Sequence, residues 1–149
     1  MDARLQDRIN RYELAVAFAR EFVDELGEER AFPIIQRAFE KLQERNGQNV
    51  ARRLGSNSFE AWAEENRQMA REYDGFEVLE ITDHEVKTKC TRCVAYEAFD
   101  ALGMPELCRL YCESDHPYIR AYNPKMKLVR TKEIANGDAY CDHVWVLEE

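Results

Sequence analysis

The first 26 residues carry an apolar pattern that is typical of a long helix. A row of apolar side chains recurs alternately four and three residues apart: Leu5, Ile9, Tyr12, Val16, Ala19, Val23 and Leu26. This heptad spacing predicts a helix over 2–26. Leu14, Phe18 and Phe22 form a second apolar row at a spacing of four. Such a helix is buried on two sides within a monomer, or it buries one row against another subunit in a homo-oligomer.

Two further helices are predicted before residue 75. The segment 31–45 has one apolar face, and Asn46-Gly47 is expected to end it. A short helical piece is expected over 49–54. A third helix runs over about 59–73, where aromatic and aliphatic residues recur at helical spacing. The first half of the chain is therefore predicted to be entirely helical.

The pattern changes at Phe76. Residues 76–81 and 85–91 alternate between apolar and polar positions, which predicts two strands, with Cys90 on the inward face of the second. Short helices are expected over 94–102 and 105–113. The segment 114–125 contains two prolines and is interpreted as a loop.

The last part of the chain reads as a β-hairpin. Strands are predicted over 126–134 and 139–147, around the turn signal Asn136-Gly137. A strict two-residue turn would place Lys132 opposite Cys141 and Arg130 opposite His143. A three-residue loop through Asp138 would shift this register.

Together these elements predict an α+β fold. The N-terminal helices pack on a C-terminal antiparallel sheet with two short inserted helices. The length of 149 residues fits a single domain. We expect a helical part over 1–75 and an α+β part over 76–149 within that domain.

Composition narrows the classes of partner. The net charge is −8 and no basic cluster exceeds Arg52-Arg53, which disfavours a nucleic-acid partner. No apolar run is long enough to span a membrane, and the N-terminus has no apolar signal segment, so we expect a cytoplasmic protein with reduced thiols. An acidic protein repels small acids at long range, so an acidic ligand would need a local cation.

The candidate chemistry lies in the second half. All five cysteines fall within the last 60 residues. Cys93 lies where a strand enters a helix, a position that favours the thiolate. Cys112 precedes Asp115 by three residues, and Cys141 is followed by Asp142 and His143. We expect a catalytic centre built from Cys93, Cys112, Asp115, Cys141 and His143, although each thiol alone could simply be a buried structural residue.

The same residues also allow a metal site. Cys90-x-x-Cys93 and Cys108-x-x-x-Cys112 could form a four-sulfur zinc or iron–sulfur site, but Cys108 sits between leucines in a helix and is interpreted as a core residue. If a metal such as zinc is bound, its expected ligands are Cys93, Cys112, Cys141 and His143.

Several short motifs in the second half resemble one family. They follow in order as Cys93-Val-Ala-Tyr-Glu97, Leu102-Gly-Met-Pro-Glu-Leu107, Cys112-Glu-Ser-Asp115, Tyr122-Asn-Pro124, Arg130-Thr131 and Gly137-Asp-Ala-Tyr-Cys141-Asp142. Their order and spacing over about residues 85–147 resemble the L-2-amino-thiazoline-4-carboxylic acid hydrolase family. The closing Gly137-x-x-x-Cys141 is also similar to the end of V4R small-molecule-binding domains, some of which bind zinc.

The resemblance implies hydrolysis of a cyclic amidine towards carbamoyl-cysteine, on a bacterial route to cysteine. Such a reaction needs a nucleophile, a proton donor and a cation for the substrate carboxylate. Cys93 or a metal-bound water is the candidate nucleophile, and Asp115 or His143 is the candidate acid. Arg130 or Lys132, with Asp142, would bind the substrate.

Two other functions compete with a small hydrolase. One is a non-enzymatic ligand-binding or sensor module with a pocket between the sheet and the helices over 94–113. The other is a metal-binding structural or redox protein. Acids and imidazoles next to the motif cysteines favour the enzyme, because a pure binding pocket needs few polar groups.

Overall fold

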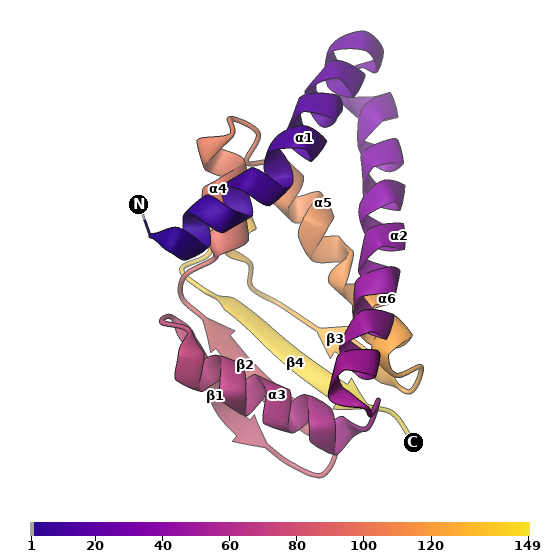
Figure 1. Ribbon diagram of the computed structural model, residues 1–149, viewed down its shortest axis with the longest axis vertical. Coiled ribbons are helices and arrows are strands. Elements are labelled where there is room, and N and C mark those ends of the chain that lie inside the picture. The colour runs from indigo at the N-terminus through magenta and orange to yellow at the C-terminus, as the bar shows by residue number, and fades with distance from the viewer. Residues whose placement is uncertain (1) are drawn as a thin grey trace.

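The computed structural model describes residues 2–149 and shows the predicted α+β fold. Long helices precede the sheet, and shorter helices are inserted between its strands (Figure 1). The helices are α1 (Ala3–Leu26), α2 (Glu28–Leu54), α3 (Phe59–Glu72), α4 (Val94–Ala101), α5 (Leu107–Glu113), α6 (Asp115–Tyr122) and the 3-10 turn η1 (Ile134–Asn136). The strands are β1 (Phe76–Ile81), β2 (Glu85–Cys90), β3 (Met126–Val129) and β4 (Cys141–Leu147).

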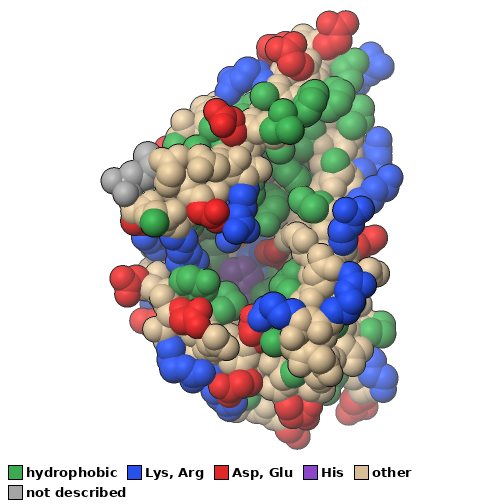
Figure 2. Space-filling view, viewed as in Figure 1, with side chains coloured by type: hydrophobic (Ala, Val, Ile, Leu, Met, Phe, Trp, Pro, Cys, Tyr) green, Lys and Arg blue, Asp and Glu red, His purple; other side chains and the backbone are tan. Residues whose placement is uncertain are grey.

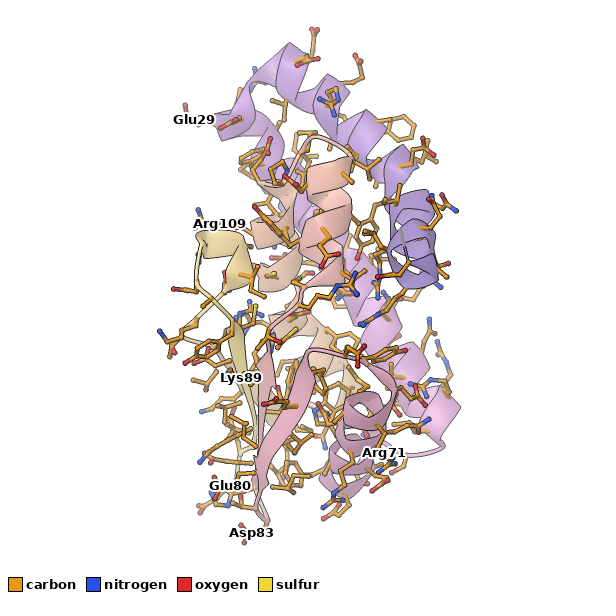
Figure 3. The ribbon with its side chains drawn as sticks, turned by 90° about the vertical axis from the view of Figure 1, so that its left-hand side faces the viewer. Glu29, Arg71, Glu80, Asp83, Lys89 and Arg109 are labelled. Atoms are coloured by element: carbon orange, nitrogen blue, oxygen red, sulfur yellow. The ribbon has the colours of Figure 1, made fainter. Side chains whose placement is uncertain are left out.

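The four strands form one antiparallel sheet in the order β1-β2-β4-β3. Val86 and Thr88 of β2 are buried, and the intervening Lys87 faces the other way, as the alternating pattern predicted. One face of the sheet is covered by α3 and α6, and the opposite face carries charged side chains such as Lys89 and Glu80 (Figure 3). This division is common in antiparallel sheets.

Two hydrophobic clusters hold the molecule together. The upper cluster joins α1, α2, α4 and α5, and the lower cluster joins the sheet to α3, α6 and the end of α2. The helical tip near Glu29 and the β1–β2 turn at Asp83 therefore lie at opposite ends of an elongated molecule (Figure 3). Among residues 2–149, no helix is long and apolar enough to cross a membrane.

The predicted helix over 2–26 is confirmed, and only one of its apolar rows is buried. Asp2 caps the helix by accepting a hydrogen bond from the Leu5 amide at 2.8 Å. The heptad row faces α4 and α2, with Val16 and Ala19 only 3% exposed. The second row, Leu14, Phe18 and Phe22, is exposed to solvent.

The helix after it is longer than predicted, because Asn46-Gly47 does not end it. α2 runs without a break from Glu28 to Leu54 and ends at Gly55, whose φ of 66° is left-handed. Gly47 is buried where α2 crosses α6. A Cβ at this position would overlap the carbonyl oxygen of Tyr118. This glycine therefore permits a close helix–helix approach and does not terminate the helix.

The loop predicted over 114–125 is wrong, because most of it is α6. Pro117 lies in the first turn of this helix, where its missing N–H removes no intrahelical hydrogen bond. Only Ser114 separates α5 from α6. The sheet is thus interrupted by three short helices where two were predicted.

The tight hairpin predicted at Asn136-Gly137 is also wrong, although its register is right. β3 ends at Val129, and the chain then makes a wider excursion through η1 before β4 begins at Cys141. Val129 pairs with Val144, which is the register that the two-residue turn implied. Continuing that register brings the side chains of Arg130 and His143 to 3.3 Å.

Candidate active site

A cavity of about 820 Å³ lies between the two hydrophobic clusters. Its walls come from α1, α2, α3, α4, α5, α6 and strands β1, β2 and β4. Figure 2 shows the hollow opening on one face of the molecule, with basic side chains around it. The volume falls in the range that small-molecule sites occupy. Of the predicted catalytic residues, the cavity is lined by Cys93, Asp115 and His143.

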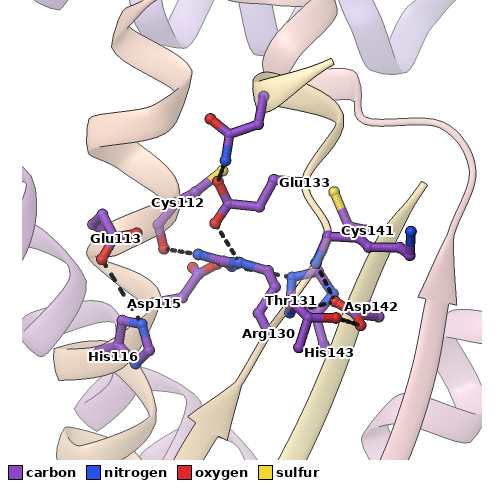
Figure 4. Close-up of polar contacts among 12 residues, drawn as sticks. Cys112, Glu113, Asp115, His116, Arg130, Thr131, Glu133, Cys141, Asp142 and His143 are labelled. Carbon is purple, nitrogen blue, oxygen red and sulfur yellow. Dashed lines mark hydrogen bonds and ion pairs between the residues drawn. The ribbon is translucent and has the colours of Figure 1, made fainter. Parts of the chain in front are cut away.

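Arg130 organises the polar wall of this cavity (Figure 4). Its side chain is 3% exposed. The guanidinium donates to Asp115 Oδ2 at 3.0 Å, to Glu133 Oε1 at 2.6 Å and to the Cys112 carbonyl at 2.9 Å. Since a guanidinium can only donate, His143 Nε2 at 3.3 Å must accept, which leaves the ring proton on Nδ1.

This environment shifts the pKa values of Asp115 and His143 in opposite directions. Burial raises the pKa of Asp115 to about 6, although the neighbouring Arg130 charge acts against that shift. Burial, and then the Arg130 charge, lower the pKa of His143 to about 4. At neutral pH, Asp115 is therefore mainly an anion that readily takes a proton, whereas His143 is a neutral hydrogen-bonding group.

Cys93 is one of the two cysteines that line the cavity. Its Sγ caps α4 and accepts a hydrogen bond from the Tyr96 amide at 3.4 Å. The neighbouring Cys108 thiol, followed by the α4 backbone amides, lowers the pKa of Cys93 to about 7 despite burial. The lowered pKa favours the thiolate, as expected for a cysteine at a helix N-terminus.

The other sulfurs lie behind this wall and do not line the cavity, apart from Cys90. Cys112 Sγ is 3.9 Å from the buried Cys108 Sγ. Cys141 is buried beside Cys90 across the β2–β4 pair, and its Sγ accepts from the Ile134 amide at 3.2 Å. Burial raises the pKa of Cys141 to about 12. Cys112 and Cys141 thus lie near the site without facing it.

The cations of the cavity were not predicted from the sequence. Five arginines line it, and Asp115 is the sole carboxylate among the described lining residues. The arginines come from α1, α2 and the β2–α4 connection: Arg4, Arg8, Arg11, Arg53 and Arg92. Arg4, Arg8 and Arg11 are spaced four and three apart on α1, a pattern visible in the sequence only once the facing cavity is known.

Two of these guanidiniums have no acidic partner. Arg11, Arg53 and Arg92 each form an ion pair with a nearby carboxylate. Within residues 2–149, Arg4 and Arg8 have none; Arg4 lies 3.9 Å from the centre of the Tyr73 ring, and Arg8 donates to the Tyr12 hydroxyl at 3.1 Å. Both remain available to hold an anion in the cavity.

The residues predicted to bind substrate lie elsewhere. Arg130 stands behind Asp115 and does not line the cavity. Lys132 is exposed, with its ammonium 5.5 Å from the Tyr140 ring centre. Asp142 accepts from the Thr131 and Lys132 amides, both at 2.7 Å, and so holds the excursion between β3 and β4.

The predicted metal ligands do not fit a metal ion as they are placed. Cys141 Sγ and His143 Nε2 already accept hydrogen bonds, and Cys112 does not face the cavity. Across the described part of the chain, no group of three or more His, Cys, Asp or Glu side chains is arranged to hold a metal. No chemical step is therefore assigned to zinc.

The fold and the cavity together define a small α+β domain built around a ligand-sized, cation-lined pocket. The chain belongs to the L-2-amino-thiazoline-4-carboxylic acid hydrolase family, whose model matches residues 7–145. The match includes the N-terminal helices, which the motif resemblance over 85–147 did not reach. A search of curated proteins finds no match.

A solved structure with a similar fold is the phenol-responsive sensory domain of the transcription activator PoxR with phenol. The TM-score is 0.56 at 12% sequence identity, over 99% of this chain and 92% of that one. At this identity the similarity concerns the fold alone.

Proposed function

We propose that the protein hydrolyses a small cyclic amidine that carries a carboxylate, opening a thiazoline-type ring towards carbamoyl-cysteine. The observation that carries this proposal is the charge pattern of the cavity: unpaired guanidiniums on α1 and a single carboxylate, Asp115, beside the Cys93 thiol. An amidine with an acid group has the complementary arrangement of charge. Family membership supports the same substrate class.

The substrate acid is assigned to Arg4 and Arg8. Both line the cavity one helical turn apart, and neither is neutralised by a carboxylate among residues 2–149. A protein with a net charge of −8 repels a small acid at long range. The two guanidiniums make the local field of the cavity positive, so an acidic ligand can still bind there. The amidine end would then face Asp115.

The chemistry is assigned to Cys93 and Asp115. The Cys93 thiolate adds to the amidine carbon of the ring, the bond from that carbon to the ring sulfur breaks, and Asp115 protonates the departing sulfur, which opens the ring and leaves the carbon bonded to Cys93. Water then attacks the same carbon, Asp115 accepts its proton, and the Cys93 thiolate is released. A pKa of about 6 lets Asp115 serve in both directions near neutral pH. Arg130 positions Asp115, and His143 contacts the same guanidinium.

The test is turnover of L-2-amino-thiazoline-4-carboxylic acid by the purified protein, with carbamoyl-cysteine detected by mass spectrometry and the free thiol by a colorimetric assay. We expect Asp115→Asn to lower kcat roughly 10²- to 10⁴-fold. Glu113→Gln is the matched control, because Glu113 lies two residues away with 57% of its side chain exposed. Wild-type protein that forms no product would overturn the proposal.

A second candidate function is ligand binding without turnover. Two observations favour it: the similarity of the fold to a sensory domain, and the aromatic part of the cavity wall, which includes Trp62, Tyr118 and Trp145. Calorimetry with the thiazoline acid and with phenol separates the alternatives. Binding of either compound with full recovery of unchanged ligand would favour the binding module, whereas consumption of the thiazoline acid would favour the hydrolase.

A further inference from the structure

The outer face of α1 is an apolar surface that nothing within residues 2–149 covers. The exposed fractions of its three large side chains are 69% for Leu14, 59% for Phe18 and 42% for Phe22. Ile34 and Leu42 on α2 are also exposed. Figure 2 shows hydrophobic side chains gathered over these two helices, above the hollow of the cavity. Contiguous apolar patches of this kind usually mark an interaction site.

The charges along α1 are arranged asymmetrically. Within α1, residues 3–12 contain three arginines and one aspartate, whereas residues 13–26 contain four acidic residues and one arginine. One end of the helix is therefore basic and the other acidic. A second copy of the same helix, lying antiparallel, would place each basic end beside an acidic end.

The positions on this face are also symmetric about Phe18. In the order Arg11, Leu14, Phe18, Phe22 and Glu25, the spacings are three, four, four and three residues. A two-fold axis through Phe18 would pack Leu14 on the partner subunit's Phe22 and would bring Arg11 to the partner subunit's Glu25. Self-complementarity of this kind is what an isologous dimer interface requires.

We propose that the protein forms a homodimer through antiparallel packing of α1 on α1 about Phe18. The occupant of the apolar face is a second copy, because the charge sequence of α1 complements its own reverse. A helix of 24 residues is about 36 Å long, which is enough for the whole row from Arg11 to Glu25 to take part in the contact. Since Arg11 also lines the cavity, the interface borders the cavity opening.

The first test is the mass of the protein in solution, measured by light scattering and sedimentation across a concentration series. We expect wild-type protein to be a dimer, and Phe18→Glu to be a monomer or to raise the dimer Kd by roughly tenfold or more. Leu79→Glu is the matched control, because Leu79 is 60% exposed on β1, away from α1, and this variant should stay dimeric. Circular dichroism verifies that each variant is folded.

A charge exchange tests the antiparallel register. Glu25→Arg should weaken the dimer, because the introduced guanidinium would face the partner subunit's Arg11. Adding Arg11→Glu in the same chain should restore it. If Phe18→Glu does not fold, Leu14→Glu and this exchange carry the test. Wild-type protein that is monomeric at all concentrations, or Phe18→Glu and Leu14→Glu variants that remain dimeric, would overturn the proposal.

Discussion

Arg130 Nη1 lies 3.0 Å from Asp115 Oδ2, and this contact joins the framework of the domain to its cavity. Arg130 comes from the end of β3, and Asp115 begins α6. The same guanidinium contacts Glu133 and the Cys112 carbonyl, so one side chain ties the sheet, two helices and the η1 excursion together. Arg130 was predicted to bind substrate; in the structure it holds Asp115 in place and does not itself line the cavity.

Replacing Arg130 should destabilise the fold strongly. Arg130→Met leaves the partly buried carboxyls of Asp115 and Glu133 without their cation, and loss of one partner from a buried pair costs about 3–5 kcal/mol. Urea unfolding followed by circular dichroism measures the loss. Arg109→Met is the matched control, because Arg109 is exposed on α5 (Figure 3), and it should change stability by less than about 0.5 kcal/mol. Equal losses in the two variants would contradict this role.

Removing the two unpaired guanidiniums should weaken substrate binding more than turnover. For the double variant Arg4→Met and Arg8→Met, we expect KM for the thiazoline acid to rise roughly 10- to 100-fold, because charge-assisted contacts to the carboxylate are lost. The expected change in kcat is smaller. Steady-state kinetics at fixed ionic strength makes the measurement.

The control removes the same two charges outside the cavity. Arg30 and Arg37 are on α2 and do not line it, so Arg30→Met with Arg37→Met should leave KM unchanged. If this control raises KM as much as the cavity variant does, the long-range charge of the protein determines affinity, and Arg4 and Arg8 have no specific role.

Periodicity predicted much of the fold, and it failed where tertiary contacts override local signals. The helix over 2–26 and the strands β1 and β2 followed from spacing alone. The helix end predicted at Asn46-Gly47 was wrong because glycine can end a helix but can also permit close packing within one, here against Tyr118. The loop predicted around Pro117 was wrong because proline is as acceptable in the first turn of a helix as in a loop.

The site was predicted in part for a similar reason. Cys93 has a local signature, a thiol at the junction of a strand and a helix, and Asp115 and His143 were flagged by their cysteine neighbours. The arginines of α1 carry no such signal, because they lie more than 80 residues from the motif cysteines in the sequence. Only the packing of α1 against α4 brings them to the cavity.

The five cysteines should differ strongly in their rates of alkylation. We expect iodoacetamide to modify Cys93 with a half-maximal rate near pH 7, in line with its lowered pKa, whereas Cys141, whose pKa is raised to about 12 by burial, should stay unmodified. Mass spectrometry of peptides after timed quenching gives the rate for each site.

A variant tests the cause of this reactivity. Cys108→Ala removes the neighbouring thiol that lowers the pKa of Cys93, so the half-maximal rate of Cys93 should move to higher pH, towards the ordinary value for a cysteine. Cys141→Ala is the control, because Cys141 accepts from the Ile134 amide and does not line the cavity. A Cys93 profile centred above about pH 8.5 in wild-type protein would rule out the thiolate as the resting nucleophile.

Asp115 should also determine how stability depends on pH. Burial raises the folded-state pKa of this carboxyl from its ordinary value of 3.8 to about 6, so between pH 4 and 6 the folded protein binds more protons than the unfolded chain. The stabilisation from Asp115 is therefore complete below pH 4 and is lost as the pH rises through 6. The shift corresponds to about 3 kcal/mol.

The contribution of His143 to stability changes with pH in the opposite direction. Its folded-state pKa of about 4 lies below the ordinary 6.5, so the unfolded chain takes up the proton first and stability falls as the pH drops from 6.5 towards 4. The two contributions oppose each other in wild-type protein.

We expect the free energy of unfolding of wild-type protein, measured with urea from pH 4 to 7.5, to change little with pH. Asp115→Asn should instead gain stability by about 3 kcal/mol over the same rise in pH. Parallel profiles for the two proteins would show that the Asp115 carboxyl titrates as if it were in water, and it would then lack the near-neutral pKa that proton transfer in both directions requires.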